Sequence, residues 1–474
     1  MCSPQITGNT THMKKLLFCI TLLACFIAQS QQAAFKLPPY QKFQLPNGLT
    51  VYLMEQKEVP LVSVSAIFPA GAIYDAQKSG LASLTASALM HGTRTMSKQV
   101  LDSTIDYLGA EVNTYAGKES AGLSARFARK DAATVLGLIR DIVLSPRFDT
   151  AEFRKEQQRT LVQLEQAKES PRQVIGNYFD QVMFAGHVYA NPASGNKASV
   201  AALSAKDVAA FYKAQYLPNG SAIAVAGDFD SREMKKLLAD LFGKWTKGNL
   251  PANLANQPIN APASAKVLLV NKDDARETTF YIGAPGVSRS NPDLVAIDVI
   301  NTILGGRFTS WLNDELRVNS GLTYGANSGF SSLKNGGSFR ISTFTATKNT
   351  AAAIDKALEV MQRLHTQGVD ENTLASAKNY VKGQFPPRYE TSGQLAGLLT
   401  QMYWYGFDES YINNFQKQVD GLTTARAKEI IQRYFPKDKL QFVLVGKASE
   451  IRELAKKWGP VTEVNIKEEQ AKSF

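Results

Sequence analysis

Cysteine is almost absent from this sequence of 474 residues. All three cysteines, Cys2, Cys19 and Cys25, lie near the N-terminus. The rest of the chain therefore has no disulfide and no thiolate metal ligand, and its stability has to come from packing. Basic residues outnumber acidic ones by 11, yet the chain has no Lys/Arg run with interleaved aromatics, which argues against nucleic-acid binding. No later segment reaches the length of a transmembrane helix.

The N-terminal segment has the pattern of a cleaved secretion signal. Residues 1–30 are interpreted as an upstream extension followed by a signal peptide. Lys14 and Lys15 precede an apolar run that is too short to span a bilayer, and Ala28-Gln29-Ser30 is a small-x-small cleavage site. We therefore predict an exported protein of the periplasm or cell envelope. In a competing interpretation Cys25 ends a lipoprotein box and is acylated, and only then would the protein be held at a membrane.

A helix of small residues is predicted over Leu81–Met90, between two glycines. Ser83, Ala86 and Ser87 share one face of it, at i, i+3 and i+4. An H-x-x-E-H motif uses this spacing to place two histidines on zinc, with a glutamate beside them as general base. Here serine replaces both histidines and alanine replaces the glutamate. Taken alone, the stretch is more simply explained as a closely packed helix.

The second part of the chain repeats the first. Tyr216-Leu217-Pro218 and a predicted strand ending at Gly227 recur as Tyr434-Phe435-Pro436 and a strand ending at Gly446, so that the offset is 218 or 219 residues. This offset indicates a duplication. Residues 246–265, rich in Asn, Pro and Ala, have no periodicity and are predicted to be a linker.

Each half combines predicted strands and helices, which indicates an α+β fold. Strands are predicted over Leu49–Met54 and Leu61–Phe68, and a hairpin over 110–127. The predicted domains are residues 31–245 and 266–474, one on each side of the linker.

A helix over Thr309–Val318 and a strand over Leu322–Ser328 are predicted in the second half. They place Arg317 in the last helical turn and Tyr324 on the strand. Without further context, Arg317 offsets a helix dipole and Tyr324 is a half-buried strand aromatic.

In this order and spacing, the motifs resemble the M16 family of zinc metallopeptidases, which includes insulinase, pitrilysin and mitochondrial processing peptidase. The resemblance extends over essentially the whole chain after residue 30. The matching segments are Leu45-Pro46-Asn47-Gly48-Leu49, Gly80-Leu81-Ala82, Gly92-Thr93, Gly109 to Tyr115, Tyr216-x-Pro218, Gly227-Asp228, Leu304-Gly305-Gly306, Glu315-Leu316-Arg317 and Gly321-Leu322-x-Tyr324. The resemblance implies two homologous α/β halves with helix-covered sheets, of the M16/LuxS-like metallohydrolase type, forming half of a clam-shell.

The resemblance also assigns the positions of the zinc site. The family's two histidines correspond to Ser83 and Ser87, its catalytic glutamate to Ala86, and its third zinc ligand to Gln163. Only the supporting glutamate, Glu156, is retained. A serine hydroxyl and a neutral amide are poor zinc ligands, and alanine cannot accept a proton from water. We therefore predict that this chain holds no metal and no other cofactor.

Arg317 and Tyr324, by contrast, match the Arg/Tyr pair that the family places in its C-terminal half. The resemblance implies that the tyrosine donates a hydrogen bond near the developing oxyanion and that the arginine helps to hold the peptide. In one bacterial branch of the family, the zinc motif and this pair lie on two different chains of a heterodimer. We therefore predict a non-catalytic subunit that is inactive alone, with a zinc-bearing M16 homologue as its partner.

Peptide substrates are predicted to add as a strand along 110–115, or along the equivalent segment of the other chain. Asn113 and Tyr115 would then contact the substrate. The alternative is a pseudo-peptidase that works alone as a peptide-binding or scaffolding protein of the cell envelope. An independent hydrolase has little support, because the sequence has no G-x-S-x-G motif and no reactive cysteine after residue 30.

Overall fold

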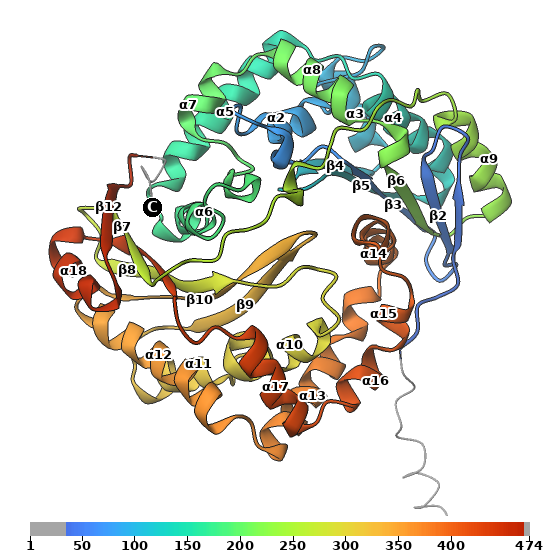
Figure 1. Cartoon of the computed structure of the whole chain (residues 1–474). Coiled ribbons are helices and arrows are strands. Elements are labelled where there is room, and N and C mark those ends of the chain that lie inside the picture. The colour runs from blue at the N-terminus through green and yellow to red at the C-terminus, as the bar shows by residue number, and fades with distance from the viewer. Residues whose placement is uncertain (1–34, 469–474) are drawn as a thin grey trace, which may run out of the picture.

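The computed structural model describes residues 35–468. The predicted signal peptide, its cleavage site and Cys25 lie outside these residues. The described chain forms two halves, each built on a six-stranded mixed sheet that is covered by helices (Figure 1). No helix among residues 35–468 is both long and apolar enough to cross a bilayer.

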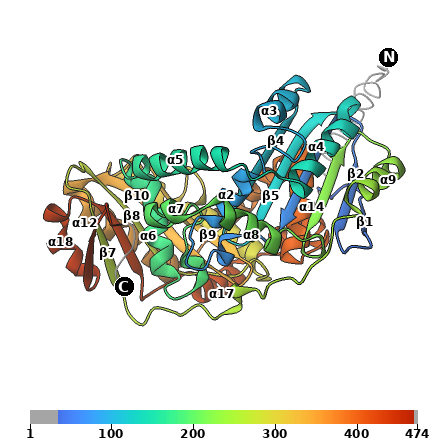
Figure 2. The same cartoon turned by 90° about the horizontal axis from the view of Figure 1, so that it is seen from above.

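The first half contains the sheet β1-β2-β6-β3-β5-β4. Its strands are β1 Gln41–Gln44, β2 Thr50–Glu55, β3 Leu61–Phe68, β4 Glu111–Ala116, β5 Ala121–Ala128 and β6 Ala222–Gly227. Its helices are α2 Leu81–Ala88, α3 Lys98–Tyr107, α4 Ala132–Leu144, α5 Thr150–Ala167, α6 Pro171–Met183, α7 Lys197–Ala202, α8 Ala205–Gln215 and α9 Ser231–Phe242. Seen from above, α4 and α9 lie over this sheet, and α8 packs against α2 beside it (Figure 2).

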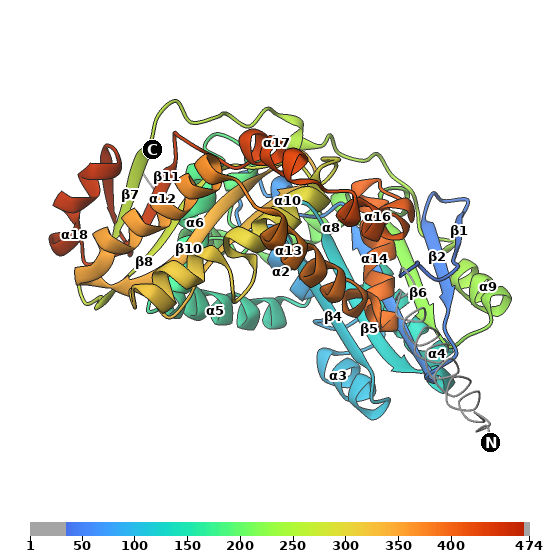
Figure 3. The same cartoon turned by 90° about the horizontal axis from the view of Figure 1, so that it is seen from below.

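The second half contains the sheet β12-β7-β11-β8-β10-β9. Its strands are β7 Lys266–Asn271, β8 Glu277–Pro285, β9 Ala326–Leu333, β10 Gly336–Ala346, β11 Gln441–Gly446 and β12 Val461–Asn465. Its helices are α10 Leu294–Asn301, α11 Trp311–Asn313, α12 Thr350–Gln367, α13 Glu371–Gln384, α14 Ser392–Tyr405, α15 Ser410–Asn413, α16 Phe415–Asp420, α17 Thr424–Tyr434 and α18 Ala448–Ala455. Seen from below, α12, α13 and α17 lie on the near face of the molecule (Figure 3).

Five strands have the same order in both sheets. The series β2-β6-β3-β5-β4 in the first half matches β7-β11-β8-β10-β9 in the second, and only the outermost strands, β1 and β12, differ. The central strands β6 and β11 are buried along their whole length. They are covered on both faces, which explains why their sequences are nearly continuous apolar runs.

The two halves exchange a helix. The α6 helix of the first half packs on β8 and β11 of the second sheet, and α14 of the second half packs on β3 and β6 of the first. Both lie between the upper and lower halves in Figure 1. The turn between β4 and β5 adds a further link, because the Glu119 carboxylate accepts a hydrogen bond from the Lys334 N–H at 3.0 Å. The halves are therefore interlocked rather than joined by the connecting segment alone.

The region around Arg317 differs from the predicted pattern. The predicted helix over Thr309–Val318 is a short α-helical turn, α11, followed by the π-helix η7, Asp314–Asn319. A second π-helix, η6, extends α10 over Thr302–Gly306. The strand β9 begins only at Ala326, so Tyr324 lies in the loop before it and not on the strand. Such π-helical turns are rare and occur frequently at functional sites.

Candidate functional site

A buried carboxylate holds the N-terminus of α2. The two oxygens of Asp75 accept hydrogen bonds from the N–H groups of Gly80 and Ala82, each at 2.8 Å. Gly80 has a φ of 95°, a conformation that favours glycine. Because Asp75 is buried, its pKa rises to about 7, although the hydrogen bonds from the helix N-terminus oppose this shift. The start of α2 is thus fixed by a carboxylate from the segment that precedes the helix.

The positions of the family zinc motif lie on α2 and α5, which pack against each other. Ala86 is buried, whereas Ser83 and Ser87 are half-buried. Gln163 is exposed on α5 and lines a cavity of about 310 Å³ between α5 and α6, together with Asn177. Within residues 35–468, no group of three or more His, Cys, Asp or Glu side chains could hold a metal ion. The four zinc-site positions therefore lie on neighbouring helices but carry no metal-binding set.

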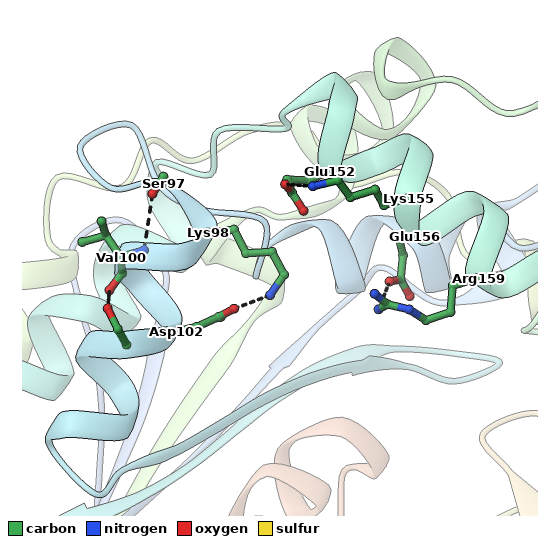
Figure 4. Close-up of polar contacts among 9 residues, drawn as sticks. Ser97, Lys98, Val100, Asp102, Glu152, Lys155, Glu156 and Arg159 are labelled. Atoms are coloured by element: carbon green, nitrogen blue, oxygen red, sulfur yellow. Dashed lines mark hydrogen bonds and ion pairs between the residues drawn. The ribbon is translucent and has the colours of Figure 1, made fainter.

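Glu156, which the family resemblance assigns as the supporting glutamate of the zinc site, is engaged by a neighbouring cation. Glu156 forms an ion pair of 2.7 Å with Arg159, one turn along α5 (Figure 4). Glu152 pairs in the same way with Lys155. His91, just beyond α2, is buried, and this burial lowers its pKa and favours the neutral imidazole, although Glu156 acts in the opposite direction. The Glu156 carboxylate is thus neutralised by a guanidinium.

The edge strand β4 lies directly beside α2. The Thr114 hydroxyl donates a hydrogen bond of 2.8 Å to the carbonyl of Ala86. The Gly117 N–H donates a hydrogen bond to the Ser120 carbonyl across the turn between β4 and β5. In an antiparallel ladder, hydrogen-bonded pairs alternate with pairs that are not hydrogen-bonded, and the register places Val112 and Thr114 in the second kind. The N–H and C=O groups of Val112 and Thr114 therefore point away from β5. No other group in residues 35–468 is hydrogen-bonded to them, so β4 presents an open edge.

A groove of about 720 Å³ lies on the opposite face of β4, between the sheet and α14. Asn113 and Tyr115 line it, and both are exposed. Ser63 and Ser65 of β3 form its floor and share hydrogen bonds with hydroxyls of α14, at 2.8 Å to Ser392 and 2.9 Å to Thr400. The open edge and this groove together form one surface that could receive an extended peptide.

The Arg/Tyr pair lies in the second half and is open to solvent. The Tyr324 side chain is 82% exposed, and its ring stacks on that of Phe344 with centroids 6.2 Å apart. Arg317, in η7, is also exposed, and its guanidinium lies 4.5 Å from the centre of the Phe308 ring. Both side chains therefore rest on aromatic rings, and neither has a hydrogen bond within the described residues. A phenol and a guanidinium in this state are available to an incoming ligand.

Comparison with known proteins agrees with these features. An insulinase-type M16 peptidase domain matches residues 50–197, and a domain described as the inactive domain of M16 peptidases matches residues 202–381. The chain belongs to the M16 peptidase family. This M16 chain is 26% identical over 343 residues to an uncharacterized zinc protease of Mycobacterium leprae, covering 72% of this chain and 76% of that protein. It is also 23% identical to a non-peptidase homolog, YmxG, of Helicobacter pylori, covering 92% and 99%.

Solved structures show the same fold. An M16 inactive domain from Pseudomonas fluorescens superposes with a TM-score of 0.81 at 24% identity, covering 86% of this chain and 98% of that one. A protease from Helicobacter pylori superposes with a TM-score of 0.80 at 20% identity, covering 86% and 100%. The expected two-halved α+β architecture of the M16 fold is therefore confirmed.

Two parts of the candidate site were missed by sequence analysis. The pair Ser63 and Ser65, which forms the floor of the groove, had a detectable signal, because two serines at i and i+2 interrupt an otherwise apolar strand. The aromatic supports of Arg317 and Tyr324 had none. Phe308 and Phe344 do not differ in sequence context from core aromatics, and only the fold places them at the surface.

Proposed function

We propose that this M16 protein is the non-catalytic subunit of a heterodimeric zinc-dependent peptidase. Arg317 and Tyr324 would come from this chain, and the zinc ion, the attacking water and the general base from a zinc-bearing M16 partner. The main support is the contrast between the two halves. The zinc-site positions carry groups that cannot bind metal, whereas Arg317 and Tyr324 keep the family's residue types and are exposed without hydrogen-bond partners in residues 35–468.

The division of roles follows from what each group can do. A tyrosine hydroxyl can donate a hydrogen bond to the oxyanion that forms when water attacks a peptide carbonyl, which lowers the barrier. A guanidinium can bind a carboxylate of the peptide with two parallel hydrogen bonds, or donate a hydrogen bond to a peptide carbonyl. Neither group can activate water, and Ala86 replaces the only candidate general base on α2. The chain alone therefore lacks the first step of hydrolysis, which the partner's zinc would supply.

Substrate peptides would add as a strand beside β4. The outward N–H and C=O groups of Val112 and Thr114 provide main-chain hydrogen bonds, and the groove beside α14 receives alternate side chains through contacts with Asn113 and Tyr115. We further propose that the protein is exported, on the basis of the pattern in residues 1–30, and that membrane attachment would require acylation of Cys25.

A peptidase assay on an unstructured peptide mixture tests this proposal. It compares this protein alone, a zinc-bearing M16 homologue from the same genome alone, and the two together. Activity that requires both proteins supports the heterodimer. Equal activity of the homologue with and without this protein contradicts it.

The second candidate is a pseudo-peptidase that binds peptides alone. It is favoured by one observation: the open edge of β4 and the groove of about 720 Å³ are complete within this single chain. Peptide binding by this protein that is unchanged by any homologue, in the absence of cleavage, would support this alternative.

A further inference from the structure

The ring of Tyr324 lies beside an aromatic ring that also contacts the other half of the molecule. Its ring stacks on Phe344 of β10, with an angle of 26° between the two planes. Phe344 in turn carries the guanidinium of Arg172, whose central carbon lies 3.4 Å from the ring centre. This is the shortest guanidinium–ring contact in residues 35–468, where the next lies at 4.2 Å. Phe344 thus contacts both the Arg172 guanidinium and the Tyr324 ring.

Arg172 reaches the second sheet because it lies on the exchanged helix α6. It occupies the second position of α6, a helix of the first half that packs on the second sheet. A cation in the first turn of a helix opposes the helix dipole. The first turn of α6 contains no acidic residue, and Ser170 makes no side-chain cap. The position is therefore electrostatically unfavourable for an arginine, and another interaction has to offset this cost.

The ion pair of Arg172 does not provide a sufficient offset. Its partner Glu277 lies 3.4 Å away, and both side chains are about half exposed, at 55% and 50%. Ion pairs at such exposure contribute little to stability because water and salt screen them. The guanidinium carbon also lies 3.4 Å from the centre of the Phe344 ring, and a cation over an aromatic ring is attracted by its quadrupole. The guanidinium therefore has a second favourable contact, with the ring that lies beside Tyr324.

We propose that Arg172 is a positioning residue for Tyr324: its guanidinium fixes the Phe344 ring, and that ring holds the phenol at the site. This inference rests on the proposed function of Tyr324 in an active site shared with a zinc-bearing partner. It implies that the two halves of this chain jointly prepare the group that the chain contributes. It also gives a role to the helix exchange, since α6 carries the guanidinium to Phe344.

The first test observes the tyrosine directly, without catalysis. The full chain is prepared with 3-fluorotyrosine at position 324, and its ¹⁹F NMR signal is recorded for the unsubstituted chain and for Arg172→Gln, Arg172→Lys and Arg340→Gln. Arg340 is a matched control, because it lies on the same strand β10, over Tyr281 at 5.2 Å. We expect Arg172→Gln to shift the signal well beyond the change in the Arg340→Gln control. Arg172→Lys, which keeps a cation on the ring, should restore most of the original position.

The second test measures kinetics in the mixture with the zinc-bearing homologue. Arg172→Gln should lower kcat by about 3- to 10-fold with little change in KM, because it disturbs a group that acts in the transition state. If Arg172→Gln does not fold, Phe344→Leu provides the same test, since it removes the supporting ring and retains the charge.

The inference is overturned if Arg172→Gln leaves both the fluorine signal and kcat at the level of the Arg340→Gln control or, where that variant does not fold, if Phe344→Leu leaves kcat at that level. Failure of the proposed function gives a different result. In that case Tyr324→Phe would leave the activity of the mixture unchanged, while the fluorine signal would still report whether Arg172 positions the ring.

Discussion

The two sheets end in equivalent edge strands, and the two edges differ in what covers them. At β9, the Asn313 side-chain oxygen accepts a hydrogen bond from the Ala326 N–H at 2.9 Å, and the Asn301 amide donates one to the Ser328 carbonyl at 3.0 Å. These groups point away from β10, so two asparagines cap the outer edge of β9. At β4, no residue of the described chain has this role. An edge strand without a cover can pair with another extended chain, whereas a capped one cannot.

The difference arises in the helices next to the two edges. In the second half, α10 continues into the π-helix η6, which packs directly against β9. Gly305 permits this approach, because a Cβ at this position would lie 2.3 Å from the Ser328 nitrogen. In the first half, the equivalent helix α2 ends at Ala88 and has no such extension. The two halves thus have one sealed sheet edge, beside Arg317 and Tyr324, and one open edge, beside the helix α2.

Removing the cap on β9 should have the largest effect on stability. Asn301→Ala leaves the buried Ser328 carbonyl and hydroxyl without partners, and we expect a loss of about 2–4 kcal/mol in the free energy of unfolding. Asn113→Ala, on the exposed face of β4, is the matched control and should change it by less than about 0.5 kcal/mol. Urea denaturation measures both. Equal losses in the two variants would contradict the contrast between the edges.

The helix beside the open edge should make the stability of the chain depend on pH through Asp75. This carboxylate accepts only N–H groups from the start of α2. Burial raises the pKa of Asp75 to about 7, so the folded state holds this proton more tightly than the unfolded chain does. The stabilisation is therefore complete below the unfolded pKa of about 4 and is lost as the pH rises through about 7.

The difference in unfolding free energy between the unsubstituted chain and Asp75→Asn isolates this titration. We expect the stability of the unsubstituted chain, relative to the variant, to fall by on the order of 4 kcal/mol from pH 4 to pH 8. A difference that stays constant or increases over this range would show that burial of Asp75 does not control its proton affinity.

The open edge of β4 can be blocked without changing its pairing with β5. Thr114→Pro removes an outward N–H, and proline is tolerated on edge strands at such positions. We expect binding of a labelled unstructured peptide, followed by fluorescence anisotropy, to weaken by about 10-fold, which corresponds to roughly one lost hydrogen bond. Thr114→Val loses the hydroxyl but keeps the N–H, and should bind as the unsubstituted chain does. Similar weakening in both variants would place the peptide elsewhere.

Much of the fold follows from local sequence patterns. The strand predicted over Leu61–Phe68 has the observed bounds, and the predicted hairpin over 110–127 is formed by β4 and β5. The exchange of α6 and α14 could not be predicted, because an amphipathic pattern shows that a helix has a buried face but not which sheet covers it. The π-helices were missed for a related reason: over five or six residues, their period cannot be distinguished from that of an α-helix.

The candidate site was predictable only where motifs are contiguous. Arg317 and Tyr324 were identified through the family resemblance, but the strand expected to carry Tyr324 begins two residues later, at Ala326. Arg172 and Phe344 are brought together by a contact between halves that no local pattern contains. Whether the outward N–H and C=O groups of β4 are capped depends on distant parts of the chain. The sequence of β4 alone therefore could not show that this edge is open.

The central claim, a peptidase site shared between two chains, is tested most directly by Tyr324→Phe in the mixture with the zinc-bearing homologue. This substitution removes one hydroxyl from an exposed ring, and should leave folding and association unchanged. We predict that kcat of the mixture falls by roughly 10²-fold, as expected when one oxyanion donor is lost, while the affinity between the two proteins stays the same. Full activity of the Tyr324→Phe mixture, with association intact, would contradict the account.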